Sequence, residues 1–153
     1  VAKGFFEWLG QAIPGAAETV ASVALPKAVA SNSYPARLER SLIRTGLRHH
    51  FGPDALVSAS LVFRPKPAPD VYLLAAERLG VDPGGCLVVE DSLAGVTAAA
   101  AAGMTILGFT GASHVAPGQD AVLRAAGAAA VVETMAAVKD WIAAMAGSGK
   151  PGP

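Results

Sequence analysis

The sequence predicts a doubly wound α/β fold, in which helices cover both faces of a parallel sheet. Short apolar runs such as residues 87 to 89 are typical of strands that are buried on both faces. Helix patterns alternate with these runs along the whole chain. A length of 153 residues is enough for one domain with its own core.

The local patterns predict the individual elements in order. Helices are expected where apolar residues recur at helical spacing or alanine dominates, at residues 1–12, 16–22, 35–47, 70–79, 92–102, 118–126 and 135–146. Strands are expected at the short apolar runs, at residues 28–30, 56–58, 87–89, 104–110 and 129–133. Asp70 is placed to cap the helix that starts there, and the stretch "RPKPAPD" before it is expected to be a stiff extended loop.

Composition excludes several classes of protein. Hydrophobic residues make up 52% of the chain and charged residues 16%, which argues against disorder. The formal net charge is zero and no basic run occurs, so a nucleic-acid surface is not expected. No apolar stretch resembles a membrane span or a signal peptide, and the single cysteine, Cys86, fits a reducing compartment. We therefore expect a cytoplasmic protein that contacts neither nucleic acid nor membrane.

Polar groups follow three of the predicted strands. Residues 31 to 33 (Ser-Asn-Ser) follow the first, Lys66 stands between two prolines after the second, and Glu90 and Asp91 follow the third. The carboxyl ends of parallel strands meet at one edge of a sheet, where ligands bind. A hydroxyl, an ammonium and two carboxylates on that edge suit a phosphate group together with a divalent cation.

Each residue also has a simpler interpretation. Ser31 could be a loop hydroxyl, Lys66 a solvated lysine and Asp91 the N-cap of the next helix. A single geometry explains all three, which favours a site. Two adjacent carboxylates about 5 Å apart repel by roughly 3 kcal/mol at an effective dielectric of about 20, so a positive group is expected beside them.

Three short motifs resemble those of a known family. "SN" at 31–32, "KPAPD" at 66–70 and "VVEDSLAG" at 88–95 are similar, in this order, to the second, third and fourth motifs of the haloacid dehalogenase superfamily. The stretch from about residue 14 to 140 resembles its branch of β-phosphoglucomutases and phosphoglycolate phosphatases. The resemblance implies a Rossmann-like core.

The resemblance also implies roles for individual residues. Ser31 and Asn32 would bind the phosphoryl group, and Lys66 would neutralise that group and the nucleophile. Asp91 would bind Mg²⁺, with Glu90 nearby or acting through a water. Oxygen ligands without a Cys/His cluster favour Mg²⁺ over Zn²⁺ on chemical grounds as well. The expected partner is a small phosphorylated metabolite.

The sequence departs from the family pattern at its first motif, Asp-x-Asp. No two acidic residues are separated by a single residue, and no cap domain is recognisable. Residues 1–13 are therefore expected to be a remnant of the last cap helix, residues 14–146 the C-terminal portion of the core, and residues 147–153 a flexible tail. The central first strand is expected to be missing, so that another segment or chain has to complete the sheet.

Two functional classes follow. The first is a Mg²⁺-dependent phosphomonoester hydrolase or mutase, acting through an aspartyl-phosphate on an N-terminal segment that this chain lacks; the chain alone is then inactive. The second is a catalytically inactive fragment that binds phosphate or metal or serves as an interaction module. A receiver-type signalling domain fits less well, because its acidic pair and lysine come in the reverse order.

Overall fold

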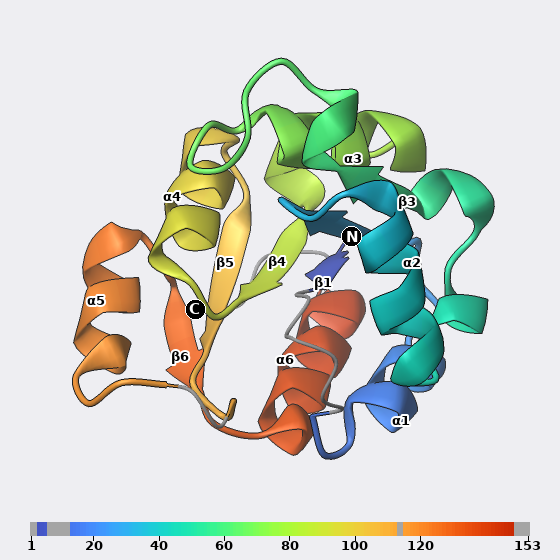
Figure 1. Ribbon diagram of the computed structural model, residues 1–153. Helices are drawn as coiled ribbons and strands as arrows, with labels where there is room; N and C mark the ends of the chain where they lie inside the picture. The colour runs from blue at the N-terminus through green and yellow to red at the C-terminus, as the bar shows by residue number, and fades with distance from the viewer. Residues whose placement is uncertain (1–2, 6–12, 113–114, 149–153) are drawn as a thin grey trace.

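The computed structural model describes residues 3–5, 13–112 and 115–148. One six-stranded parallel sheet has helices on both faces (Figure 1). The strands are β1 (Lys3–Phe5), β2 (Ala28–Ser31), β3 (Leu56–Ser58), β4 (Leu87–Glu90), β5 (Thr105–Phe109) and β6 (Ala130–Val132). The α-helices are α1 (Ala16–Ser22), α2 (Pro35–Arg44), α3 (Asp70–Leu79), α4 (Leu93–Ala101), α5 (Gln119–Ala126) and α6 (Met135–Ser148). Single 3-10 turns lie at Arg48–His50, Pro53–Ala55, Ala59–Leu61 and Pro83–Gly85.

The strand order β3-β2-β1-β4-β5-β6 is that of a doubly wound sheet. The chain runs from the centre outward to β3, returns to β4 beside β1, and continues to the other edge. Helices α1 and α6 pack together on one face, while α4 lies between α3 and α5 on the other (Figure 1). The predicted fold class is thus confirmed.

Strand β1 corrects the expectation that the central strand is missing. Gly4 pairs with Ala28 of β2 and also with Val88 of β4. The helix expected over residues 1–12 is therefore wrong for Lys3–Phe5, and residues 6–12 lie outside the described residues. The physical reason is that β2 and β4 present backbone donors and acceptors toward the gap between them, and satisfying these groups outweighs a weak helical preference.

The core lies on both faces of the sheet. Strands β2 and β4 are buried along their whole length, as their apolar runs predict. The largest side chains that are fully buried include Tyr72 of α3 and Phe109 of β5. Among the described residues, no helix is long and apolar enough to cross a membrane.

Two helices end at positions that differ from the sequence expectation. Helix α2 ends at Arg44, because Gly46 takes a left-handed conformation (φ 71°) and the N–H of Leu47 donates to the carbonyl of Leu42. Helix α6 continues to Ser148, two residues into the expected tail, and residues 149–153 lie outside the described residues.

The caps of α3 and α4 also differ from expectation. Asp70 does not cap α3; it is the first helical residue, and its carboxylate accepts hydrogen bonds from the guanidinium and the backbone N–H of Arg64. Ser92, rather than Asp91, is the N-cap of α4, and its hydroxyl accepts the N–H of Gly95 at 3.0 Å. The cap interpretation of Asp91 is therefore wrong.

Candidate functional site

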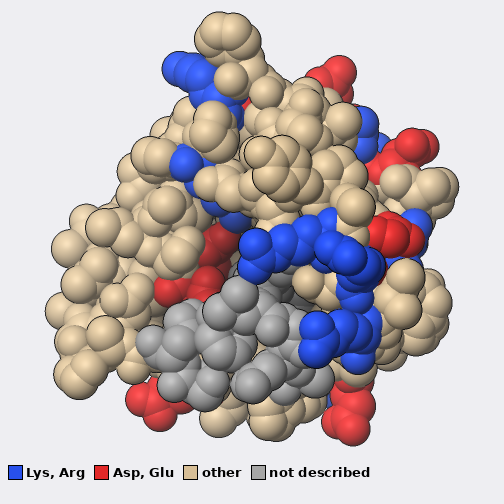
Figure 2. Space-filling view, viewed as in Figure 1, with Lys and Arg blue, Asp and Glu red and all other residues tan. Residues whose placement is uncertain are grey.

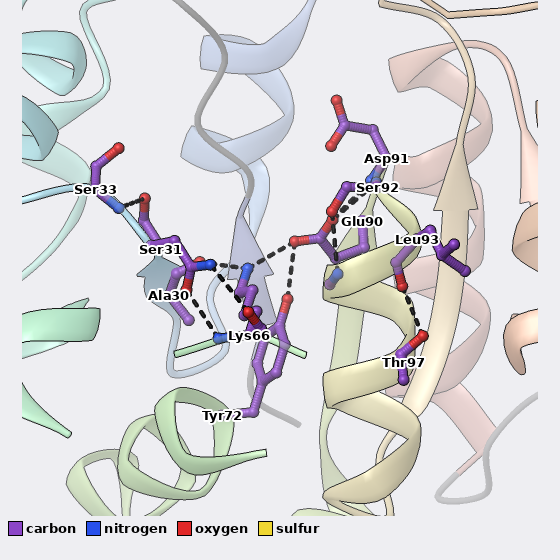
Figure 3. Close-up of polar contacts among 12 residues, drawn as sticks. Ala30, Ser31, Ser33, Lys66, Tyr72, Glu90, Asp91, Ser92, Leu93 and Thr97 are labelled. Carbon is purple, nitrogen blue, oxygen red and sulfur yellow. Dashed lines mark hydrogen bonds and ion pairs between the residues drawn. The ribbon is translucent and has the colours of Figure 1, made fainter. Parts of the chain in front are cut away.

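The carboxyl ends of β2 and β4 flank β1, and the side chain of Lys66 joins them. Its Nζ donates to the backbone carbonyl of Ala30 at 3.0 Å and to Oε1 of Glu90 at 2.7 Å (Figure 3). Ser31 follows Ala30 and Asp91 follows Glu90, so the structure brings Ser31, Lys66 and Asp91 to one edge of the sheet. The predicted convergence is confirmed.

The carboxylate of Glu90 accepts hydrogen bonds from several groups at this end of the sheet. Its Oε1 accepts from Lys66 and, at 3.0 Å, from the hydroxyl of Tyr72. Its Oε2 accepts, at 3.0 Å each, the backbone N–H groups of Asp91 and Ser92 and the hydroxyl of Ser92. The residue is only 3% exposed. Both oxygens are thus used by donors of this chain, and the role of Glu90 beside Mg²⁺ stays a prediction.

Gly95 allows the first turn of α4 to pass directly over Glu90. A Cβ atom at position 95 would collide with the Glu90 carboxyl group. The glycine is therefore required by close approach rather than by an unusual backbone angle. This glycine ends the motif "VVEDSLAG", and the sequence alone does not indicate its role.

Lys66 is held through both its backbone and its side chain. Asn32 Oδ1 accepts the Lys66 N–H at 2.9 Å, and Asn32 Nδ2 donates to the Lys66 carbonyl at 3.3 Å. The ammonium lies 4.7 Å from the centroid of the Tyr72 ring, and the Lys66 side chain is 8% exposed. Asn32 therefore shapes the lysine loop, and its contact with a phosphate stays a prediction.

The loop after β2 is tied to the neighbouring strand. Ser31 Oγ accepts the N–H of Ser33 at 3.0 Å. The hydroxyl of Ser58, at the end of β3, donates to the carbonyl of Ser33 at 2.6 Å. A hydrogen bond within the loop and a second one from β3 to the same loop therefore hold Ser31 at the rim.

Asp91 is directed away from Glu90. Figure 3 shows the Asp91 carboxylate turned away from the Glu90 carboxylate. The Asp91 carbonyl accepts from Gln119 Nε2 at 3.2 Å, and the residue is 9% exposed. Acidic and basic side chains lie side by side in a hollow of this face (Figure 2). The expected repulsion is thus offset by Lys66 on one carboxylate and by the divergent direction of the other.

Burial and hydrogen bonding act in opposite directions on the ionisable groups. Burial alone would raise the pKa of Glu90, but the Lys66 charge and the hydrogen bonds from Lys66, Ser92 and Tyr72 outweigh it and lower that pKa below its ordinary value. Burial, followed by the charge of Glu90, raises the pKa of Tyr72 well above its ordinary value. Tyr72 therefore remains a protonated donor. The sequence did not identify Tyr72 as a site residue, because a tyrosine on one face of a helix is usually an ordinary core residue.

The lowered pKa of Glu90 predicts acid sensitivity. The stability that ionised Glu90 contributes is complete above its ordinary pKa of 4.5 and is lost as the pH falls through the lower pKa of the folded state. Urea unfolding of the wild type and of Glu90→Gln, compared between about pH 6 and about pH 3, measures this effect. The loss of stability at low pH is expected to be smaller in Glu90→Gln. An equal loss in both proteins would exclude Glu90 as a source of the acid sensitivity.

The comparisons with known proteins agree with these motifs. A family model described as haloacid dehalogenase-like hydrolase matches residues 2–103. The fructose-1-phosphate phosphatase YqaB of Escherichia coli K12 is 51% identical over 79 residues, which cover 52% of this chain and 41% of that protein. The 6-phosphogluconate phosphatase of the same organism is 32% identical over 107 residues, covering 70% of this chain and 48% of that protein.

A solved structure with a similar fold contains a bound anion. The crystal structure of a HAD family hydrolase from Deinococcus radiodurans R1, with bound phosphate and sodium, superposes with a TM-score of 0.80 at 39% identity and covers 92% of this chain and 62% of that one. The chain spans less than half the length of the two curated relatives. The family match and this fold confirm the resemblance seen in the motifs, and the chain belongs to the haloacid dehalogenase-like hydrolase family.

Proposed function

We propose that this site belongs to a Mg²⁺-dependent phosphomonoester hydrolase whose substrate is a sugar phosphate or a small phosphorylated acid. The observation that carries the proposal is the position of the Lys66 ammonium, held between the end of β2 beside Ser31 and the end of β4 beside Asp91. A buried cation with a hydroxyl on one side and a carboxylate on the other suits a phosphate group with its metal. Both curated relatives described above are named as phosphatases of sugar-derived phosphates.

Each residue has a defined part in this proposal. Ser31 donates to a phosphoryl oxygen, and Lys66 offsets charge on the transferring group, while Asn32 and Glu90 hold the lysine in place. Asp91 is the proposed Mg²⁺ ligand; Mg²⁺ commonly binds through one or two carboxylates, waters and substrate phosphate, so a single well-placed carboxylate fits it. When bound, Mg²⁺ neutralises charge on the phosphoryl group.

The proposed nucleophile is an aspartate outside these 153 residues. No pair of acidic residues in the chain has the Asp-x-Asp spacing. The carboxylate attacks phosphorus, the ester oxygen leaves with its bonding pair, and water then hydrolyses the aspartyl-phosphate. In this arrangement the chain contributes phosphate binding, charge neutralisation and a metal ligand, and the nucleophile comes from elsewhere.

The charge around the site favours anionic substrates. Helix α2 starts just after the Ser31 loop and carries Arg37, Arg40 and Arg44, all exposed, at a spacing that places them along one side of the helix. Figure 2 shows Lys and Arg side chains gathered over this helix. A local excess of positive charge raises the concentration of phosphorylated compounds near the rim.

The alternative is a catalytically inactive module that binds phosphate or metal. The same missing Asp-x-Asp spacing favours it. Among the described residues, no group of three or more His, Cys, Asp or Glu side chains is placed to hold a metal ion. The two proposals differ in whether a chain that also carries an Asp-x-Asp segment hydrolyses phosphate esters.

The 153-residue chain alone is expected to show no hydrolysis of p-nitrophenyl phosphate with Mg²⁺. Cys86 is buried before β4, away from the rim. Ser31 has no histidine close to it in the sequence that could activate its hydroxyl as a nucleophile. Release of p-nitrophenol by the purified chain is the measurement, with Ser31→Ala and Lys66→Ala as controls. Turnover that disappears in these controls would reveal a nucleophile at this rim and contradict the expectation.

In a longer chain that includes an Asp-x-Asp segment, Asp91→Asn is expected to weaken Mg²⁺ binding, so that turnover needs a higher Mg²⁺ concentration, and to reduce kcat by orders of magnitude. An amide oxygen is a poorer Mg²⁺ ligand than a carboxylate. Turnover of fructose 1-phosphate and 6-phosphogluconate is measured against Mg²⁺ concentration. The matched control is Asp120→Asn, because Asp120 is an exposed aspartate of α5 that pairs with Arg124. An unchanged Mg²⁺ dependence in Asp91→Asn would remove Asp91 as a ligand.

A further inference from the structure

A pocket lies at the amino ends of the strands, whereas Lys66 lies at their carboxyl ends. Its volume is about 440 Å³, and its walls come from residues 23–27, residues 50 and 52–55, and the end of α3 at Arg78 and Leu79. The first segment leads into β2 and the second leads into β3, so the pocket lies at the amino ends of these strands. The residues of the candidate site follow the carboxyl ends instead.

Two cations in the pocket wall are anchored by backbone carbonyls. Lys27 Nζ donates to the carbonyls of Val20 and Val23, at 2.9 and 3.0 Å. Arg78 Nη1 donates to the carbonyls of Asp54 and Leu56, at 3.2 and 3.4 Å. Within the described part of the chain, neither cation forms an ion pair. An ammonium has three N–H groups and a guanidinium five, so both cations retain donors beyond these bonds.

The charge of the pocket is positive. Its wall contains Lys27 and Arg78 against one carboxylate, Asp54, which leaves one positive charge when His50 is neutral. His50 responds to this environment: burial first, and then the neighbouring His49 and Lys27, lower its pKa. The charges of His49 and Lys27 therefore act on His50 as like charges that disfavour its protonated form.

The rest of the wall determines the kind of anion that fits. Its apolar members are Val23, Ala24, Leu25, Pro26, Pro53, Ala55 and Leu79. We infer that this pocket binds a small organic anion with a phosphate, phosphonate or carboxylate group, held by Lys27 and Arg78, and with a compact apolar body against the wall. This inference does not depend on the proposed phosphatase function.

Residue-resolved NMR titration of the 153-residue chain tests the inference. The probes are phenylphosphonate, benzoate and, as the neutral counterpart of similar shape, benzyl alcohol. Saturable shifts of the Lys27, Gly52 and Ala55 amides are expected with at least one of the two anions and not with benzyl alcohol. The amides distinguish this pocket from the rim, where Ser31 and Asp91 would report, and the two anions distinguish a phosphonate from a carboxylate preference.

Two variants complete the test. Arg78→Met is expected to lower the affinity for the anion by about tenfold or more. Lys139→Met, which removes an exposed lysine of α6, is expected to leave this affinity unchanged. Equal weakening by both variants, equal binding of benzyl alcohol, or no saturable shift of the three amides would overturn the inference. If Arg78→Met does not fold, the comparison of the charged and neutral probes on the unmodified chain decides whether the pocket binds anions.

Discussion

Replacing Glu90 by alanine is expected to lower the free energy of unfolding by about 3–5 kcal/mol, because it leaves a buried ammonium without its counter-charge. Lys66 has a side chain that is 8% exposed, and Glu90 Oε1 is 2.7 Å from its Nζ. The same change leaves the buried Tyr72 hydroxyl and two backbone N–H groups without their acceptor. Urea unfolding monitored by circular dichroism measures the loss.

A matched control separates this effect from the loss of any glutamate. Glu77 is an exposed glutamate of α3 that forms no ion pair with the described residues, so Glu77→Ala is expected to change stability by less than about 0.5 kcal/mol. The double variant Lys66→Met with Glu90→Leu removes both charges and is expected to be more stable than Glu90→Ala alone. A loss of stability in Glu90→Ala no larger than that in Glu77→Ala would show that the buried ion pair does not stabilise the fold.

Gly95→Ala is expected to destabilise the fold by about 1–3 kcal/mol and to displace the Glu90 carboxylate from Lys66. The added methyl group would overlap the Glu90 carboxyl group, which has no room to move because five donors hold it. Either α4 shifts outward or the hydrogen bonds to Glu90 break. Both outcomes lower stability, and both are visible as altered NMR shifts of the Asp91 and Ser92 amides.

Gly147→Ala is the matched control for this substitution. Gly147 lies near the end of α6, and a Cβ atom there would meet nothing within 4 Å. Alanine has a higher helix propensity than glycine, so this control is expected to be neutral or slightly stabilising. A Gly95→Ala protein as stable as the Gly147→Ala protein would contradict the close approach of α4 to Glu90.

The elements of the sheet that have strong local signals could be predicted from the sequence. The strand around residues 87–89 is apolar throughout because both its faces are buried, and the helix predicted at 70–79 has the same bounds in the structure. The convergence of Ser31, Lys66 and Asp91 was predictable too, because parallel strands bring their carboxyl ends to one edge.

The remaining features depend on tertiary contacts that no local pattern contains. Lys3–Phe5 joins the sheet because β2 and β4 leave a gap there, whereas the same residues read as part of a helix in sequence. The difference between Glu90 and Asp91 could not be predicted either. They are adjacent carboxylates, but only the first lies within reach of Lys66, Tyr72 and the N-terminal turn of α4. The two neighbouring carboxylates therefore have different surroundings in the folded chain, although the sequence shows them only as adjacent like charges.

A titration of the 153-residue chain with inorganic phosphate, followed residue by residue by NMR, tests the proposed phosphate site at the carboxyl ends of β2 and β4. We predict saturable shifts of the Ser31, Asn32 and Ser33 amides, and weaker binding at these amides in Ser31→Ala but not in Ser60→Ala, a neighbouring exposed serine that bonds to Ser58. Phosphate that shifts none of these amides, or that binds there equally well without the Ser31 hydroxyl, would contradict a phosphate site at these strand ends.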